Sequence, residues 1–388
     1  MTIKMVRLGD VCEVVSGSTP KSNIPEYWDG EIKWITPAEL NDDSYVIYDS
    51  VRHITDLGVQ KTGLKPFPVG TVILSSRAPI GKTAIAGCEM YCNQGFKNLI
   101  CSETIDNRYL FHYLSAKTEY LNSLGRGATF KEISKGIVEN IEIPLPPLEK
   151  QRRLADQFEQ INQLIFLRKT QISKLDQLVK SRFIELFGDC LTNPKGWKTK
   201  HLEDIAEVGS SKRVFVEELK DAGVPFYRGT EVGALAEGKR IKPELFITEE
   251  HYAELCEATG IPRIGDLLMP SICPDGRIWV VNSDEPFYFK DGRVLWVHNI
   301  DASYNSIFLL YTLKDRIMTD YSSIASGTTF AELKIFALKK CRVFDVPLAL
   351  QNEFAAFIEQ TDKSKFDIKR SLEKLEMLKK SLMQQYFG

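Results

Sequence analysis

The sequence predicts an α+β protein in which two α/β globular heads are separated by two long antiparallel coiled-coil helices with pseudo-twofold symmetry. Three observations carry this prediction. The stretch 127–188 recurs at 327–388 in one register, at an offset of 200 residues. Each copy of the stretch contains a long segment with the apolar spacing of a helix. Each copy is also preceded by a region with mixed strand and helix signals.

The repeat keeps its register over about sixty residues, which chance matching does not do. It begins Gly-Ala-Thr-Phe-Lys-Glu-Ile in the first copy and Gly-Thr-Thr-Phe-Ala-Glu-Leu in the second. The pairs at this offset include Thr129 and Thr329, Phe130 and Phe330, Glu132 and Glu332, Pro147 and Pro347, Gln151 and Gln351, Lys174 and Lys374, and Gly188 and Gly388. The chain is therefore a tandem duplication.

Residues 1–146 form the first predicted head. A short helix or turn at 6–17 leads into a strand, and 32–36 has the β-branched and aromatic content of another strand. The segment 71–76 is predicted as a buried strand with 81–86 as its hairpin partner. Helical spacing covers 107–124 and a strand closes the head at 141–145.

The first long helix is predicted over 147–188, because no proline or glycine occurs between Leu148 and Phe187. Its apolar residues follow steps of three and four, which is typical of a coiled coil about 60 Å long at about 1.5 Å per residue. Such a helix needs a partner to cover its apolar stripe. The second long helix, 347–388, supplies that partner.

The linker 189–197 joins the first helix to the second head, 198–346. A linker of this length spans at most about 30 Å, so it cannot return along the first helix. The second head is therefore expected near the far end of that helix, with the second helix running back. The two heads agree in the order of their predicted elements more than in their amino-acid sequence. The duplicated stretch therefore serves as a common frame for two heads that differ in sequence.

Composition excludes several classes of protein. The 388 residues suffice for two domains, and 43% hydrophobic and 26% charged residues are ordinary for globular proteins. No apolar run reaches eighteen residues and the N-terminus lacks the apolar core of a signal peptide, so we expect no membrane contact and a cytoplasmic location. A net charge of −2 argues against a generally basic coat, although local basic faces remain compatible with it.

Known catalytic and metal-binding motifs are weak or missing. The stretch 76–83 nearly matches a phosphate-binding loop, but it lacks the first glycine and lies between two predicted strands, so a β-turn presenting a cation is favoured. The eight cysteines are scattered and are interpreted as reduced core thiols. Cys88 and Cys92 have no second ligand pair, which disfavours zinc. The chain is therefore expected to catalyse nothing and to hold no metal or cofactor.

Polar loops are the functional candidates, since Arg, Lys, Gln and Asn read base edges while Ser, Thr and Lys hold phosphates. In the first head they are Ser18, Thr19, Lys21, Arg77, Lys82, Asn93, Gln94, Lys97, Arg126 and Thr129. In the second head they are Ser211, Lys212, Arg213, Arg228, Thr230, Lys239, Arg240, Arg277, Lys290, Arg293, Ser326 and Thr329. For each one the alternative is a solvated surface group, and for Thr129 and Thr329 it is a capping role beside a core phenylalanine.

The motifs together resemble the specificity subunit of type I restriction-modification systems over the whole chain. The matching segments are Gly17-Ser18-Thr19-Pro20, Tyr27-Trp28, Trp34-Ile35-Thr36, Asn93-Gln94-Gly95-Phe96 and the signature Ile143-Pro144-Leu145-Pro146-Pro147-Leu148-Glu149-Lys150-Gln151. In the second copy the signature decays to Val346-Pro347-Leu348-Ala349-Leu350-Gln351, so that copy rests on register.

The resemblance implies two target-recognition domains, each reading one half of a bipartite site on double-stranded DNA. It implies that the long helices fix the gap between the half-sites and dock two modification subunits, which carry S-adenosylmethionine and methylate adenine, and that restriction subunits can join them. The alternatives left open are a two-headed structural adaptor that binds proteins and an enzyme with a hidden site. The sequence motifs do not specify the target bases or the number of base pairs between the half-sites.

Overall fold

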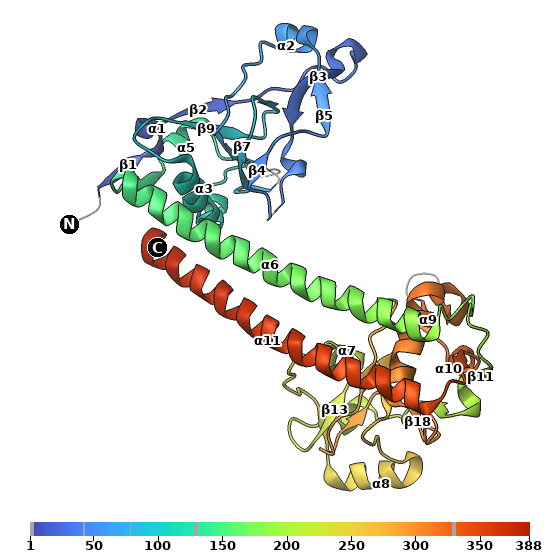
Figure 1. Cartoon of the computed structure of the whole chain (residues 1–388). Helices are drawn as coiled ribbons and strands as arrows, with labels where there is room; N and C mark the ends of the chain where they lie inside the picture. The colour runs from blue at the N-terminus through green and yellow to red at the C-terminus, as the bar shows by residue number, and fades with distance from the viewer. Residues whose placement is uncertain (1–3, 42, 78, 128–130, 328–330) are drawn as a thin grey trace. The chain divides into compact units, whose positions relative to one another are not determined.

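A computed structural model describes residues 4–41, 43–77, 79–127, 131–327 and 331–388. The contacts between Cα atoms divide the chain into two units. The first comprises Met1–Thr170 with Lys369–Gly388, and the second comprises Gln171–Ile368 (Figure 1). Each unit therefore contains one head and one end of each long helix. The loops that contain Thr129, Phe130, Thr329 and Phe330 lie outside the described residues.

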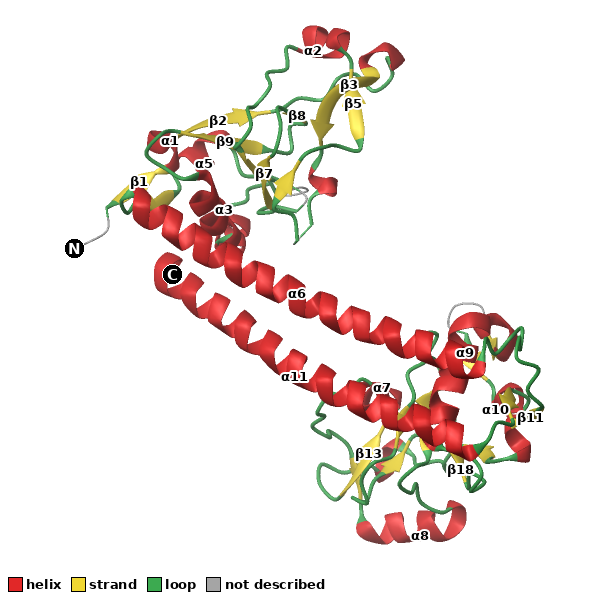
Figure 2. Ribbon diagram, viewed as in Figure 1, coloured by secondary structure: helices red, strands yellow, loops and turns green. Residues whose placement is uncertain are grey.

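The head of the first unit is built on two small sheets (Figure 2). A five-stranded sheet has the order β2-β9-β6-β7-β4, with β2 Cys12–Ser16, β9 Lys97–Cys101, β6 Val72–Leu74, β7 Thr83–Ala86 and β4 Val46–Ile47. A three-stranded sheet has the order β5-β3-β8, with β5 Arg52–Ile54, β3 Trp28–Ile35 and β8 Tyr91–Cys92. The predicted hairpin is confirmed, since β6 and β7 pair antiparallel.

Short helices and one further strand pair complete this head. The helices are α1 Leu8–Val11, η1 Pro25–Tyr27, η2 Pro37–Glu39, α2 Asp56–Thr62, α3 Asn107–Ala116, α4 Thr118–Ser123 and α5 Lys135–Glu139. The pair is β1 Met5–Arg7 with β10 Glu142–Pro144. The single helix predicted over 107–124 is wrong in one respect: it is interrupted at Lys117, whose backbone (φ −105°, ψ 18°) leaves the helical region.

The head of the second unit repeats this plan. Its four-stranded sheet has the order β12-β18-β15-β16, with β12 Glu207–Gly209, β18 Val294–His298, β15 Leu267–Pro270 and β16 Trp279–Val280. Its three-stranded sheet has the order β14-β13-β17, with β14 Phe246–Ile247, β13 Val224–Tyr227 and β17 Tyr288–Phe289. Two strand pairs join β11 Thr199–His201 to β21 Arg342–Phe344 and β19 Ala325–Ser326 to β20 Glu332–Leu333. The helices are η3 Leu202–Asp204, η4 Val216–Glu218, α7 Gly229–Ala236, α8 Glu249–Thr259, α9 Ser306–Ile324 and α10 Ile335–Lys339.

The two heads share the pairing of their strands although their amino-acid sequences differ. In the first, β3 pairs antiparallel with β5 and parallel with β8; in the second, β13 pairs antiparallel with β14 and parallel with β17. The helix after β5 is capped by Thr55 and the helix after β14 by Thr248, each through its hydroxyl oxygen. The prediction that one frame carries two heads is confirmed at this level.

The long helices are α6 Leu148–Phe187 and α11 Leu348–Phe387, each of 40 residues. In the first unit the beginning of α6 meets the end of α11, because the rings of Phe158 and Phe387 stack at 5.5 Å. In the second unit the end of α6 meets the beginning of α11, where Phe187 and Phe354 pack edge to face at 5.5 Å. Within each unit the two helices therefore run antiparallel.

Each head is fastened to its helix by a buried glutamine. The Gln151 carboxamide donates to the carbonyls of Thr104 (3.0 Å) and Pro146 (2.8 Å) and accepts from the Asp106 backbone N–H (2.9 Å). The Gln351 carboxamide likewise donates to Ser303 (3.0 Å) and Val346 (2.9 Å) and accepts from Asn305 (2.8 Å). Both glutamines are fully buried, so these hydrogen bonds satisfy groups that water cannot reach. We call this arrangement the glutamine joint.

No helix among the described residues is long and apolar enough to cross a membrane.

Candidate nucleic-acid interface

The loops that follow β2 and β8 lie side by side in the first head, next to strand β3. The Ser18 backbone N–H donates to the Cys92 carbonyl at 3.0 Å, and the Thr19 hydroxyl donates to the Gln94 side-chain oxygen at 2.5 Å. The indole N–H of Trp34 donates to the Ser18 carbonyl at 3.0 Å. Ser18, Thr19 and Gln94, predicted separately from the sequence, are therefore brought to one surface.

Glycine makes this approach of the loops possible. A Cβ at Gly17 would lie 1.9 Å from the Cys92 carbonyl oxygen, a distance that only glycine permits. On the opposite loop, the Asn93 side-chain oxygen accepts from the Gly95 backbone N–H at 2.8 Å, which fixes the turn that carries Gln94. Asn93 thus serves at least partly to shape its own loop.

Two predicted cations of the first head are engaged within the protein. Lys97 is only 7% exposed, and its ammonium group lies 3.1 Å from the Glu132 carboxylate. The Lys82 ammonium group donates to the Leu40 carbonyl. These contacts correct the expectation that both lysines are presented to a ligand: Lys97 is buried, and a buried charge must be paired inside the fold, while the Lys82 ammonium group is taken by a backbone carbonyl.

The remaining candidates of this head are more open. Arg126 and Lys21 are exposed and Arg77 is half-buried, and within the described part of the chain no ion pair holds these three side chains. The Arg126 backbone pairs with that of Glu132. Thr129 lies outside the described residues. Of the predicted cations of the first head, Arg77, Arg126 and Lys21 thus remain available to an anionic ligand.

The second head contains a groove of about 940 Å³. Five predicted residues line it together with apolar neighbours: Arg228, Thr230, Arg277, Lys290 and Arg293. Thr230 lies in the first turn of α7, and the other four lie in the segments that follow β13, β15 and β17; β13 and β17 pair as β3 and β8 do in the first head. The structure therefore brings together residues that are up to 65 positions apart (293 − 228).

Carboxylates accompany the arginines of this groove. Arg228 lies 2.6 Å from Glu231 and 3.3 Å from Glu244, Arg277 lies 2.8 Å from Asp275, and Arg293 pairs with Glu332. Burial would raise the pKa of Glu231, but hydrogen bonds from the Arg228 side chain and backbone outweigh it and lower that pKa to about 2. The groove therefore offers oriented donors rather than an unopposed positive field.

The loop after β12 lies beside the same segment. The Ser211 hydroxyl donates to the Phe289 carbonyl at 2.6 Å, and the Lys212 backbone N–H donates to the Tyr288 hydroxyl at 2.9 Å. Arg213 pairs with Asp291 at 3.1 Å. The Ser211 hydroxyl is thus occupied by the fold, which corrects the expectation of a free phosphate contact, while Lys212 is exposed.

Three further predictions lie elsewhere. Lys239, which pairs with Glu237, and Arg240 are exposed beyond α7 and do not line the groove. Ser326 is exposed on β19. Thr329 lies outside the described residues.

Sequence reasoning missed one loop-fixing glutamate at each site, Glu39 in the first head and Glu231 in the second. The Glu39 carboxylate accepts from the Thr36 backbone N–H at 2.7 Å, and the Glu231 carboxylate accepts from the Arg228 backbone N–H at 2.8 Å. Both glutamates follow a strand end by the three-residue spacing of a capping box, which is the sequence signal that identifies them. They fix the loops after β3 and β13.

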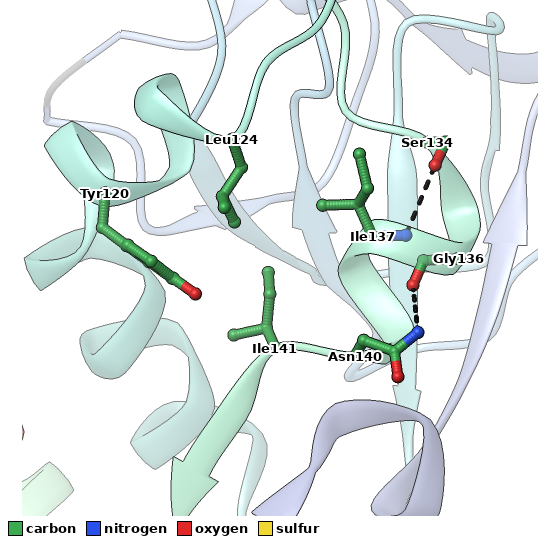
Figure 3. A pocket seen from close by; sticks show the side chains of 7 residues that line it. All are labelled: Tyr120, Leu124, Ser134, Gly136, Ile137, Asn140 and Ile141. Carbon is green, nitrogen blue, oxygen red and sulfur yellow. Dashed lines mark hydrogen bonds between the residues drawn. The ribbon is translucent and has the colours of Figure 1, made fainter.

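A smaller pocket of about 410 Å³ lies in the first head between α4 and α5 (Figure 3). Its lining is Tyr120, Leu124, Ser134, Gly136, Ile137, Asn140 and Ile141. Ser134 accepts from the Ile137 backbone N–H and the Asn140 amide donates to the Gly136 carbonyl at 2.7 Å, so both polar groups serve α5 (Figure 3). None of the predicted site residues lines this pocket.

Among the described residues, no group of three or more His, Cys, Asp or Glu side chains is arranged to hold a metal ion.

Two stretches of the chain, 2–177 and 194–379, match the family model described as the type I restriction modification DNA specificity domain. The MjaIX specificity subunit of a type I restriction enzyme of Methanocaldococcus jannaschii is 31% identical over 379 residues, which is 91% of this chain and 85% of that protein. The MjaVIII specificity subunit of the same organism is 24% identical over 405 residues, or 98% of this chain and 91% of that protein.

Solved structures share the fold. The S subunit of a type I restriction-modification system from M. genitalium matches with a TM-score of 0.59 at 14% identity, covering 100% of this chain and 96% of the other. A chain from a study of complex assembly and conformational transition in the type I system matches with a TM-score of 0.61 at 20% identity, covering 100% and 99%. At these identities the likeness establishes the fold alone.

Proposed function

Because this chain belongs to the family of type I restriction-modification DNA specificity subunits, we propose that it recognises a bipartite sequence on double-stranded DNA and catalyses no reaction itself. Each head reads one half of the site. The paired helices set the distance between the halves and dock two modification subunits. Its place of action is the cytoplasm.

The observation that carries the proposal is that the two heads share their framework of strands but differ in the side chains of their loops. Both heads share the strand pairing of their three-stranded sheets and the glutamine joint. Their loops differ chemically: the Gln94 amide and the Thr19 hydroxyl meet in the first head, while three arginines line the groove of the second. A constant frame with variable polar loops is what a protein needs to read two unrelated short sequences.

The chemistry of methylation and cleavage is assigned to partner subunits. S-adenosylmethionine would be bound by the modification subunits, which would methylate adenine, and restriction subunits would join the same assembly. The charge of −2 fits this division, since one head alone should bind DNA weakly and the affinity should arise from two heads and their partners acting together.

Exposed apolar side chains on the long helices support the proposal that the modification subunits dock there. Phe166 on α6 and Phe366 on α11 are both 66% exposed and are related by the 200-residue offset. Leu178 and Leu378, also at that offset, are 49% and 47% exposed. Large apolar residues repeated at equivalent exposed positions are typical of protein contacts, and two equivalent sets suit two copies of one partner.

The test is to map methylated adenines in cells that express this chain with its modification partner. We expect one motif with two specific parts about one helical turn apart. Replacing residues 1–146 by the first head of a relative should change one part only. A motif with a single continuous part, or methylation independent of this chain, would contradict the proposal and favour the alternative of a two-headed adaptor that binds proteins.

A further inference from the structure

One position in each head combines exposure with a fixed orientation. In the first head the Ser76 backbone N–H donates to the Gly95 carbonyl at 2.8 Å; in the second, the Ser271 backbone N–H donates to the Arg293 carbonyl at 2.9 Å. Gly95 and Arg293 are therefore equivalent in the ladder that joins the sheet strands. Gln94 immediately precedes Gly95, so the loop position of Gln94 in the first head is one residue from the position of Arg293 in the second.

The Gln94 carboxamide is oriented by one hydrogen bond and keeps further hydrogen-bonding groups open. It is exposed, and its oxygen accepts one hydrogen bond from the Thr19 hydroxyl at 2.5 Å. A carbonyl oxygen has a second lone pair, and the NH₂ group carries two donors. Within the described part of the chain no partner takes that NH₂ group. One acceptor site and the donors therefore remain for a ligand, in an orientation that Thr19 fixes.

Arg293 is held in a similar way. One terminal nitrogen (Nη1) pairs with the Glu332 carboxylate, while 58% of the side chain stays exposed at the edge of the groove. Its Nε and Nη2 groups have no partner among the described residues. The other groove arginines are more engaged: Arg228 uses Nε and Nη2 on Glu231, and Arg277 uses Nε on Asp275 and Nη1 beside Glu237.

These two side chains carry different base-reading chemistry. A carboxamide matches the donor and acceptor that adenine presents in the major groove, whereas a guanidinium matches the two acceptors of guanine. We propose that Gln94 and Arg293 are the base-reading residues of the two heads, Gln94 for an A·T pair and Arg293 for a G·C pair. The inference rests on the proposed function and goes beyond it by naming the readers and the bases.

The buttressing residues define supporting roles. Thr19 and Glu332 touch the readers and orient them, so both act as positioning residues. A pre-oriented reader loses less side-chain entropy on binding than a free one. Because Glu332 is an anion, it also opposes the approach of phosphate to Arg293, which directs that arginine toward base edges.

The experiment uses the full chain co-expressed with its modification partner and reads methylated adenines across the genome. Gln94→Ala should relax one A·T position in one half-site, and Arg293→Ala should relax one G·C position in the other. Each loss of discrimination should be about 10- to 100-fold. Arg293→Lys should retain part of the preference, since lysine also contacts guanine. Lys135→Ala on α5 and Arg342→Ala on β21 serve as controls that should leave the motif unchanged.

Base analogues give an independent measurement on the assembled complex. Replacing the assigned guanine by 7-deazaguanine removes the N7 acceptor. It should weaken binding by the wild-type complex about tenfold while leaving the Arg293→Ala complex unaffected. 7-Deazaadenine should act likewise on the wild type and the Gln94→Ala variant.

Two failures are distinguishable. If the variants methylate the wild-type motif without relaxation, or relax a base pair of the other kind, the assignment of the readers is overturned while the proposed function stands. If methylation does not depend on this chain at all, the proposed function fails first. Circular dichroism of each purified variant confirms that the heads are folded.

Discussion

Gln151 accepts a hydrogen bond from the backbone N–H of Asp106 at 2.9 Å, and the Asp106 carboxylate in turn caps α3. A helix of the head and the long helix α6 are therefore fixed to each other through one buried amide. Gln151→Ala would leave the Asp106 N–H and two carbonyls without partners. We expect a loss of about 3 kcal/mol in the free energy of unfolding of the first unit.

Hydrogen exchange measured by mass spectrometry locates this effect. Gln151→Ala should speed exchange in α3, and Gln351→Ala should speed exchange in α9, each without altering the other unit. Gln163→Ala, an exposed glutamine on the same helix, should change exchange little. Equal loss of protection in both units for either variant would show that the joint does not act locally.

Phe387 fills an aromatic pocket of the first unit. Its ring centroid lies 5.5 Å from those of Tyr109 and Phe158 and 5.6 Å from that of Tyr113. Phe387→Ala should cost this unit about 3–5 kcal/mol because it removes a buried ring and leaves a cavity. Urea unfolding followed by tyrosine fluorescence measures the loss. Phe366→Ala, at an exposed position, is the matched control and should cost less than about 0.5 kcal/mol.

His112 predicts a pH dependence of stability. It is 1% exposed, its Nε2 has no partner among the described residues, and its ring lies 5.1 Å from those of Phe111 and Phe158. Burial, with smaller contributions from Lys379 and Arg108, lowers its pKa from 6.5 to about 3. The unfolded chain therefore takes up a proton below pH 6.5 that the folded chain refuses, so stability falls as the pH drops from 6.5 toward 3.

His112→Phe should remove this contribution, which amounts to at most about 1.4 kcal/mol per pH unit in that range. Urea unfolding at pH 7 and pH 4.5 compares the two proteins. The variant should lose less stability than the wild type between these values. Parallel losses would show that His112 is not the group responsible.

The exposed phenylalanines of the long helices predict partner contacts. Phe166→Ala combined with Phe366→Ala should leave folding intact, because both rings are largely in solvent. The double variant should bind the modification partner at least about tenfold more weakly, as loss of large apolar anchors does at protein interfaces. Titration calorimetry with the purified partner measures this. Lys363→Ala on α11 is the control, since its exposed ammonium group pairs with Glu359 of the same helix.

Much of the frame could be predicted because its signals are local. The absence of glycine and proline and the three- and four-residue spacing specify α6, and the structure has it at Leu148–Phe187. The hairpin of β6 and β7 follows from two short apolar runs and their turn. The break at Lys117 was missed, since no glycine or proline near it in the sequence signals the end of a helix.

The electrostatics of the candidate site depend on contacts across the fold. Lys97 and Glu132 are 35 residues apart in the chain, and Arg293 and Glu332 are 39 apart. No pattern in the sequence marks these as partners. Sequence reasoning could therefore name the cations but could not tell which ones the protein neutralises. The role of every candidate in DNA binding remains a prediction.

The division of the chain into units has a consequence for its biosynthesis. The second unit is one continuous stretch, Gln171–Ile368, so all of it is available once those residues have left the ribosome. The first unit needs Lys369–Gly388 as well, and Phe387 enters a pocket whose partner Phe158 was made 229 residues earlier (387 − 158). The head translated first is therefore the one completed last. Until then its unfilled aromatic pocket would be exposed to chaperones, which reverses the usual order in which an N-terminal domain matures before the next.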